Sequence, residues 1–167
     1  MRMEEPRTQN QEPGAEGAYS FRNLLLWQKA QDLALAVIKV LASLPRDNAA
    51  QIIGRQLLAS AGSIGANVAE GHGRFSLAAH KNHLSIAKGS VCETDSWLYL
   101  LRRAGYLDAE AEQRLHQDCQ EIIRMLTAKI LDLERRENRR GRAAFREDFS
   151  PYEAADYLPG EEVPGSR

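Results

Sequence analysis

The sequence predicts an all-α protein: an antiparallel up-and-down four-helix bundle with disordered N- and C-terminal tails. Four long segments repeat apolar residues every three or four positions, which is the period of an amphipathic helix. Short turn sequences separate these segments, and no run alternates with strand period over a useful length. The 167 residues suffice for one domain with a real core. We place a disordered arm at 1–19, the bundle at 20–136 and an Arg-rich, then acidic, largely disordered tail at 137–167.

The first helix is expected at about 24–44. Its apolar positions recur with helical spacing, and Asn23 has the side chain of an N-cap. Pro45 stops the helix because proline cannot donate to the helical hydrogen bonds. The preceding arm is too poor in apolar residues to bury a core, and it has no apolar region typical of a signal peptide.

The second helix is expected at about 49–70, with Asp47 or Asn48 as its cap. Gly62 and Gly65 each cost about 1 kcal/mol of helix propensity relative to alanine, so packing must offset them. The sequence at 71–73 should end the helix, because glycine readily adopts the left-handed conformation.

Two stripes lie side by side on this second helix. The stripe of very small residues comprises Ala59, Gly62, Ala66, Ala69 and Gly73. The polar stripe comprises Gln56, Ser60, Ser63, Asn67, Glu70 and Arg74. Small residues let another backbone approach closely, and polar groups beside such a contact lose water and need partners. We therefore expect the segment to dock against another helix, in the same chain or in a neighbouring one.

The third helix is expected at 77–104, capped by Ser76 and followed by a break at Gly105. Asp108 should cap the fourth helix, which has a buried face as far as Leu133 and is expected to fray at 135–136. Cys92 and Cys119 both fall within amphipathic patterns, which favours two reduced core thiols over a disulfide.

Overall charge and hydropathy narrow the class of protein. The net charge of −1 argues neither for nor against nucleic acid. No apolar run approaches the roughly 20 residues that span a bilayer, so we expect a soluble cytoplasmic protein without membrane contact.

The tail carries the strongest local charge. Its basic block comprises Arg135, Arg136, Arg139, Arg140, Arg142 and Arg146. Phosphate contacts from such a block would be salt-sensitive and tolerant of sequence, and the absence of interleaved aromatic residues argues against base stacking. The acidic residues that follow could fold back and mask the arginines. Alternatively, the aromatic residues among them could dock a partner protein, as a motif of Phe149, Tyr152, Tyr157 and Leu158.

Several motifs resemble one known family. Residues 63–74, SIGANVAEGHGR, resemble the S-I-P-A-N-I-A-E-G-x-G-R motif of the four-helix-bundle proteins encoded in 23S rRNA intervening sequences. Residues 21–30 resemble the opening F-x-x-L-x-x-W-Q-K-A of that family, and residues 87–93 resemble its A-x-G-S-x-x-E. Gln56 and Ala61 fit the lead-in Q-x-x-x-x-A. The resemblance covers roughly Phe21 to Leu133.

The resemblance implies a left-handed antiparallel bundle that assembles as a homopentamer. It extends more distantly to the accessory proteins of diversity-generating retroelements, which bind a reverse transcriptase and nucleic acid. The chain departs from the family at Gly65, where proline is usual. Glycine keeps the backbone donor that proline lacks, so we expect a straighter helix here.

Some side chains suggest chemistry at first sight. Glu70, His72 and Arg74 look catalytic, and Glu93 could add a second carboxylate, but nothing places a nucleophile, metal or cofactor beside them. His80 and His83 lie one turn apart without a third ligand at matching spacing, which favours a solvated helix start over a metal site. We predict no catalytic, cofactor or metal residue. The residues expected to hold the architecture are Gln56, Gly62, Ser63, Ala66, Asn67, Glu70, Gly71, Arg74 and Glu93, with Glu70 and Glu93 pairing Lys88 or Arg74.

A second basic track is possible on the bundle itself, although an ordinary solvated face with ion pairs would look the same. Its members are Arg55, Lys81, Lys88, Arg102 and Arg103. Together these observations favour a non-enzymatic, homo-oligomeric scaffold that associates with RNA, DNA or a nucleoprotein such as a reverse transcriptase. The alternative is a protein–protein adaptor that acts through the C-terminal tail without binding nucleic acid; an enzyme is a more distant possibility.

Overall fold

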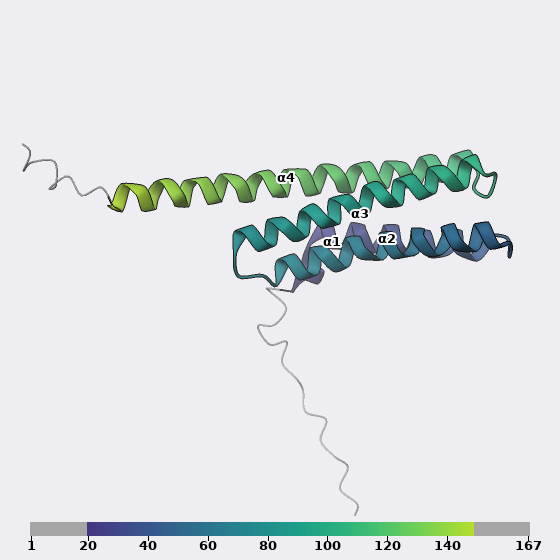
Figure 1. Ribbon diagram of the computed structural model, residues 1–167, viewed down its shortest axis with the longest axis horizontal. Coiled ribbons are helices and arrows are strands. Elements are labelled where there is room, and N and C mark those ends of the chain that lie inside the picture. The colour runs from purple at the N-terminus through teal and green to yellow at the C-terminus, as the bar shows by residue number, and fades with distance from the viewer. Residues whose placement is uncertain (1–19, 149–167) are drawn as a thin grey trace, which may run out of the picture.

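The computed structural model describes residues 20–148, with side chains as far as Gly141. Its elements are the short 3-10 helix η2 (Phe21–Asn23) and the helices α1 (Leu25–Ser43), α2 (Asn48–His72), α3 (Leu77–Arg103) and α4 (Ala109–Asp148). Each long helix packs against the next, and α4 also packs against α1, so the four form an antiparallel bundle (Figure 1). The predicted all-α fold is confirmed, and the described range contains no strand. The expected disorder at 1–19 and beyond 148 lies outside the described residues.

Three of the predicted helix caps are confirmed. The carboxylate of Asp47 accepts the Ala50 N–H at 2.9 Å, and Asp108 accepts from Ala111 at 2.7 Å. Ser76 caps α3 in the same way. Each cap satisfies a backbone donor that has no partner inside its helix.

Asn23 was the wrong cap for α1. It lies inside η2, and the N-cap position falls on Leu24, which makes no side-chain cap bond. The extra 3-10 turn moves the start of α1, and the serine hydroxyl of Ser20 caps that turn instead by accepting the Arg22 N–H.

The end of α2 also differs from the prediction. Gly73 is the C-cap in a right-handed conformation, with φ −78°, and its N–H bonds to the carbonyls of Ala69 and Glu70. In the described chain only Gly105, between α3 and α4, has a positive φ, at 80°. The backbone conformation therefore requires glycine in the α3–α4 turn, at Gly105, but not at the end of α2, at Gly73.

The core is formed by one face of every long helix. Its largest fully buried side chains include Leu33, Leu57, Ile64, Leu84, Leu98, Leu101, Ile122 and Leu126. Both cysteines are free thiols, and Cys119 is buried, which raises its pKa to about 12. Cys92 is exposed, so the prediction of two core thiols is wrong for this residue: its turn of α3 faces outward.

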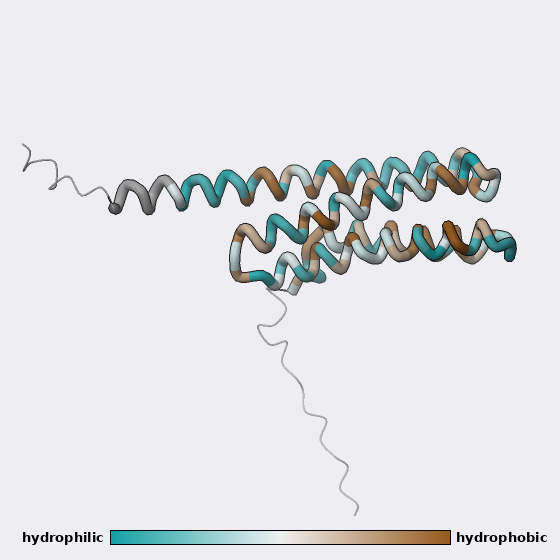
Figure 2. The backbone as a smooth tube through the Cα atoms, viewed as in Figure 1, coloured by the Kyte–Doolittle hydropathy of each residue, from teal (hydrophilic) through white to brown (hydrophobic). Residues whose placement is uncertain are grey.

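The helix α4 is longer than the expected boundary at 136. It continues to Asp148 and protrudes beyond the other three helices (Figure 1). The part of this extension that Figure 2 colours is mostly hydrophilic. The sequence from 134 to 148 is rich in glutamate, arginine and alanine, which are good helix formers. The arginine block therefore begins on a helix rather than in an irregular tail. Within the part of the chain that the structure describes, no helix combines the length and apolar character of a membrane span.

Candidate functional site

A row of hydrogen-bonded polar side chains joins α2 to α3. The Thr94 hydroxyl donates to Ser60 Oγ at 3.0 Å inside the core, where both residues are buried. One turn along α2, Ser63 Oγ accepts from Ser90 at 3.0 Å and from the Asn67 amide at 3.0 Å. The polar stripe predicted on the second helix thus finds its partners on the third helix of the same chain.

The row ends in a cluster at the junction of α2 and α3. Arg74 Nε donates to His83 Nε2 at 3.1 Å, and the Arg74 guanidinium also bonds the carboxylate of Glu70. Because arginine can only donate, Nε2 of His83 must accept, which leaves Nδ1–H to donate to Asn67 Oδ1 at 3.3 Å. These contacts tie the α2–α3 turn to both helices.

The residues expected to hold the architecture fall into two groups. Ser63, Asn67, Glu70 and Arg74 are all members of the hydrogen-bonded row. Glu93 is not: its carboxylate accepts from Trp97 Nε1 at 3.2 Å, so its expected pairing with Lys88 or Arg74 is absent from the described contacts. Gln56 lies exposed on α2.

The small residues of α2 face two different ways. A Cβ added at Gly71 would lie 3.0 Å from the His83 Cβ and 3.3 Å from the His80 carbonyl, so this glycine allows α3 to approach closely. Gly62 faces open space, and Ala66 is exposed as well. The small stripe at positions 59, 62 and 66 is therefore exposed on the outer surface of α2.

Gly65 lies on a buried face of α2 beside that exposed stripe. It is buried against α1, where an added Cβ would lie 2.3 Å from Gln31 Nε2. The helix runs through this position without interruption. Packing of Gly65 against α1 therefore offsets the low helix propensity of glycine at this position.

The suspected catalytic constellation does not converge. His72 lines a groove described below, whereas Glu70 pairs with Arg74 and Glu93 with Trp97 on another part of the surface. Among the described residues, no group of three or more His, Cys, Asp or Glu side chains could hold a metal ion.

The basic track on the bundle is ion-paired in part. Lys81 Nζ bonds Glu137 at 2.9 Å, and this bond raises the pKa of the lysine. Arg102 lies 3.9 Å from Glu112, and Arg103 donates to the Tyr99 hydroxyl at 3.0 Å. Ion pairs therefore balance the charge of Lys81 and Arg102 among the described contacts, whereas the tyrosine hydroxyl leaves the charge of Arg103 unbalanced.

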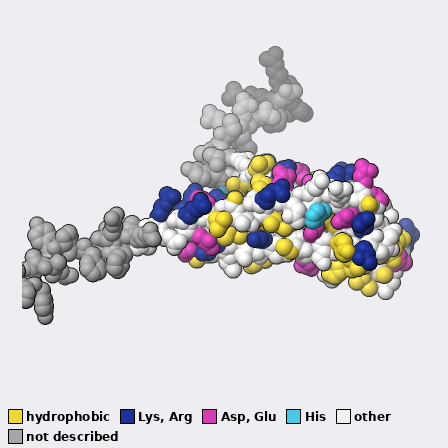
Figure 3. Space-filling model, turned by 90° about the horizontal axis from the view of Figure 1, so that it is seen from above, with side chains coloured by type: hydrophobic (Ala, Val, Ile, Leu, Met, Phe, Trp, Pro, Cys, Tyr) yellow, Lys and Arg dark blue, Asp and Glu magenta, His cyan; other side chains and the backbone are white. Residues whose placement is uncertain are grey.

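The arginines on α4 contrast with that track. Arg135, Arg139 and Arg140 are exposed, and none forms an ion pair with the side chains that the structure describes. Arg136 pairs with Asp132 at 2.9 Å. Figure 3 shows Lys and Arg side chains gathering here, beside the point where the description ends. Helical spacing places positions 135, 139, 142 and 146 in one row.

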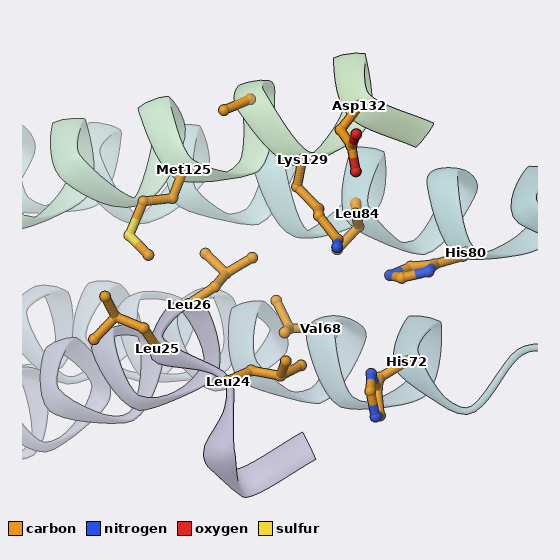
Figure 4. A pocket seen from close by; sticks show the side chains of 11 residues that line it. Leu24, Leu25, Leu26, Val68, His72, His80, Leu84, Met125, Lys129 and Asp132 are labelled. Atoms are coloured by element: carbon orange, nitrogen blue, oxygen red, sulfur yellow. The ribbon is translucent and has the colours of Figure 1, made fainter. Parts of the chain in front are cut away.

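An apolar groove opens between the start of α1 and α4, which the sequence did not reveal. Its volume is about 520 Å³. The C-terminal end of α2 and the N-terminal end of α3 complete its wall (Figure 4). The lining is mostly apolar and comprises Leu24, Leu25, Leu26, Val68, Leu84, Met125 and Ala128, with His72, His80, Lys129 and Asp132 as its polar members. Leu25 is 58% exposed.

The polar side of the groove is basic. Lys129 reaches from α4 into the opening (Figure 4). Burial lowers the pKa of His80, and the nearby Lys129, His72 and His83 lower it further. The carboxylate of Asp132 is already paired with Arg136. The groove therefore favours an occupant that combines apolar and acidic side chains.

Comparison with known proteins identifies the family. The family model of the 23S rRNA-intervening sequence protein matches residues 22–128. The chain belongs to this family. A solved structure of a protein of unknown function from the S23 ribosomal protein family of Bacteroides thetaiotaomicron is 30% identical, with a TM-score of 0.60. The match covers 64% of this chain and 98% of that one. No curated protein matches the chain.

The match separates shared from additional features of this 23S rRNA-intervening sequence protein. The hydrogen-bonded row from Ser60 to Thr94 lies wholly inside the matched residues. The arginines of α4 lie beyond residue 128, where the family model ends. Family membership therefore accounts for the bundle, while the basic end of α4 has to be interpreted from its own residues.

Proposed function

We propose that this chain is a non-enzymatic helical scaffold that assembles with copies of itself and binds nucleic acid through the basic end of α4. The observation that carries the proposal is the group of arginines on the protruding helix, Arg135, Arg139 and Arg140, which are exposed and form no ion pair with the described side chains. A rigid helix holds these charges in register, so a polyanion meets several of them at once.

Phosphate is the chemical group that this surface fits best. Guanidinium groups bind phosphate with two parallel hydrogen bonds, and each neutralised phosphate releases counterions. The binding expected here is tolerant of sequence and strongly dependent on salt. The proposed ligand is RNA or DNA, alone or within a nucleoprotein such as a reverse transcriptase.

Self-association is supported by the uncovered outer faces of α2 and α3. Ile52 is 44% exposed and Ile86 is 45% exposed, and the small positions Gly62 and Ala66 lie uncovered on α2. Apolar and small residues together on an outer face are typical of an interface between proteins. Assembly as a homopentamer remains a prediction that comes from the family resemblance.

Nucleic-acid binding is tested by removing equal charge at two places. We would compare an Arg135→Ala/Arg139→Ala/Arg140→Ala variant with an Arg55→Ala/Arg102→Ala/Arg103→Ala control, using fluorescence anisotropy with a 20-nucleotide RNA and a 20-base-pair DNA. The α4 variant should lose about tenfold or more in affinity near 0.1 M salt, and its salt slope should fall by about 2 to 3. Equal losses in both variants, or no binding by the unmodified chain, would overturn the proposal and favour the adaptor role.

Assembly is tested by adding bulk to the uncovered stripe. Gly62→Leu/Ala66→Leu should lower the mass measured by light scattering, because leucine blocks close approach of a second copy without meeting any atom of its own chain near Gly62. Ala42→Leu, at an exposed position of α1, is the control and should keep the mass of the unmodified protein. A monomeric unmodified protein would contradict this part of the proposal.

A further inference from the structure

The groove between α1 and α4 is an apolar surface that no described segment covers. Its floor includes Leu26, Val68 and Met125, and a groove of this kind with a few convergent polar groups is the usual form of a binding site. It opens at the end of the bundle from which α4 protrudes (Figures 1 and 4). An occupant must bring apolar side chains to the floor and negative charge to Lys129.

We infer that the C-terminal tail of the same chain docks in this groove, with Tyr157 and Leu158 as its apolar anchors. The tail follows directly from α4, which itself forms one wall of the groove through Met125, Lys129 and Asp132. This interaction goes beyond the proposed function and does not depend on nucleic-acid binding.

Chain length decides which tail residues reach the groove. Asp148 lies sixteen residues beyond Asp132, which is about 24 Å along a helix. Nine extended residues, 149 to 157, span about 30 Å, so a tail that turns back brings Tyr157 to the level of the groove. The four residues 149 to 152 span only about 13 Å, so Phe149 and Tyr152 fall short.

The sequence supports such a reversal after α4. Pro151 cannot donate to a continuing helix and disfavours helical geometry at Ser150. On the way back, Glu153 and Asp156 would pass over the arginine row of α4.

Charge beyond the anchors also matches the groove. Glu161 and Glu162 follow Leu158 after a Pro-Gly pair. Their carboxylates would lie near the basic groove members, including Lys129, whose amine points into the opening. The other terminal segment, residues 1–19, offers few apolar anchors, so it fits the groove less well.

Zero-length carbodiimide cross-linking of the full-length chain, without nucleic acid, tests the inference. The reagent joins an amine to a carboxylate in direct contact, and mass spectrometry locates the linkage. A mixture of ¹⁵N-labelled and unlabelled protein separates links within one chain from links between chains. We expect Lys129 to link to Glu161 or Glu162 of its own chain, and the exposed amine of Lys39 on α1 to give no such link.

Two matched variants test the anchors. Tyr157→Ala/Leu158→Ala should reduce the yield of that link about tenfold or more, because two apolar side chains no longer leave water. Phe149→Ala/Tyr152→Ala removes two similar side chains that cannot reach the groove and should keep the yield. Equal loss in both variants, no link in the unmodified chain, links between chains only, or links from Lys129 to residues 1–19 would each overturn the inference. None of these outcomes affects the test of nucleic-acid binding with the arginine variants of α4. The docking of the tail and the binding of nucleic acid can therefore be refuted independently.

Discussion

The α2–α3 seam and the α1–α4 seam hold the same bundle together by different means. Along α2–α3, buried hydroxyls bond across the interface, and Gly71 lets the two helices approach closely. Along α1–α4, an ion pair between Lys29 and Glu121 at 2.9 Å lies near the surface, and an apolar groove opens beside Leu25. A buried hydrogen bond has a strict geometry, whereas an exposed ion pair exchanges readily with water and salt. The first seam fixes the fold, and the second leaves a surface available for binding.

The prediction with the largest expected effect tests whether α4 separates from the rest of the bundle, since the groove leaves its contact with α1 incomplete. Cys119 on α4 has its pKa raised from 9.0 to about 12 by burial, which alone makes its thiolate about a thousandfold rarer at a given pH. Iodoacetamide at pH 8 should therefore label exposed Cys92 and leave Cys119 about a thousandfold slower. Peptide mass spectrometry gives both rates, and unfolding in denaturant should bring them together. Labelling of folded Cys119 within tenfold of Cys92 would show that α4 opens.

An intermediate effect compares one polar contact from each seam. Thr94→Val keeps the shape of the side chain but removes the hydroxyl, which lies 3.0 Å from Ser60 Oγ and 2.8 Å from the Ser90 carbonyl oxygen and can donate its one hydrogen to either, so the free energy of unfolding should fall by about 1–2 kcal/mol. Lys29→Ala removes the half-exposed ion pair with Glu121 and should change stability less, because water and salt still reach the two side chains. Urea denaturation followed by circular dichroism measures both. A larger loss for the lysine variant would reverse the ranking of the two seams.

The smallest effect concerns the electrostatics of the groove. Burial and then Lys129 lower the pKa of folded His80 below its ordinary value of 6.5. The unfolded chain therefore binds more protons just below pH 6.5, so this residue lowers the free energy of unfolding as the pH falls through 6.5 toward the folded-state pKa. An NMR titration of the His80 ring should show a pKa below 6.5 that rises in Lys129→Ala. The control Lys39→Ala alters no charge that acts on His80 and should leave the pKa of His80 unchanged. If that pKa does not rise in Lys129→Ala, Lys129 is not a cause of the lowered value.

The candidate site could be predicted only in part. The polar stripe of α2 was visible because Ser60, Ser63 and Asn67 recur at helical spacing. Their partners Ser90 and Thr94 were not, since a hydroxyl on another helix has no signal in its own sequence neighbourhood. The groove was also invisible, because its lining comes from all four helices.

The sequence by itself determined the four helices, the caps at Ser76 and Asp108, and membership of the family, and it narrowed the cap of α2 to Asp47 or Asn48. These features depend on contacts within a few residues or on periodicity along one helix. Only the tertiary structure decided that Gly71 faces α3 while Gly62 faces outward. The same holds for the opening between α1 and α4. The physical reason is that a small or apolar side chain is equally suited to a close internal contact and to an uncovered face, and only the placement of neighbouring helices distinguishes the two.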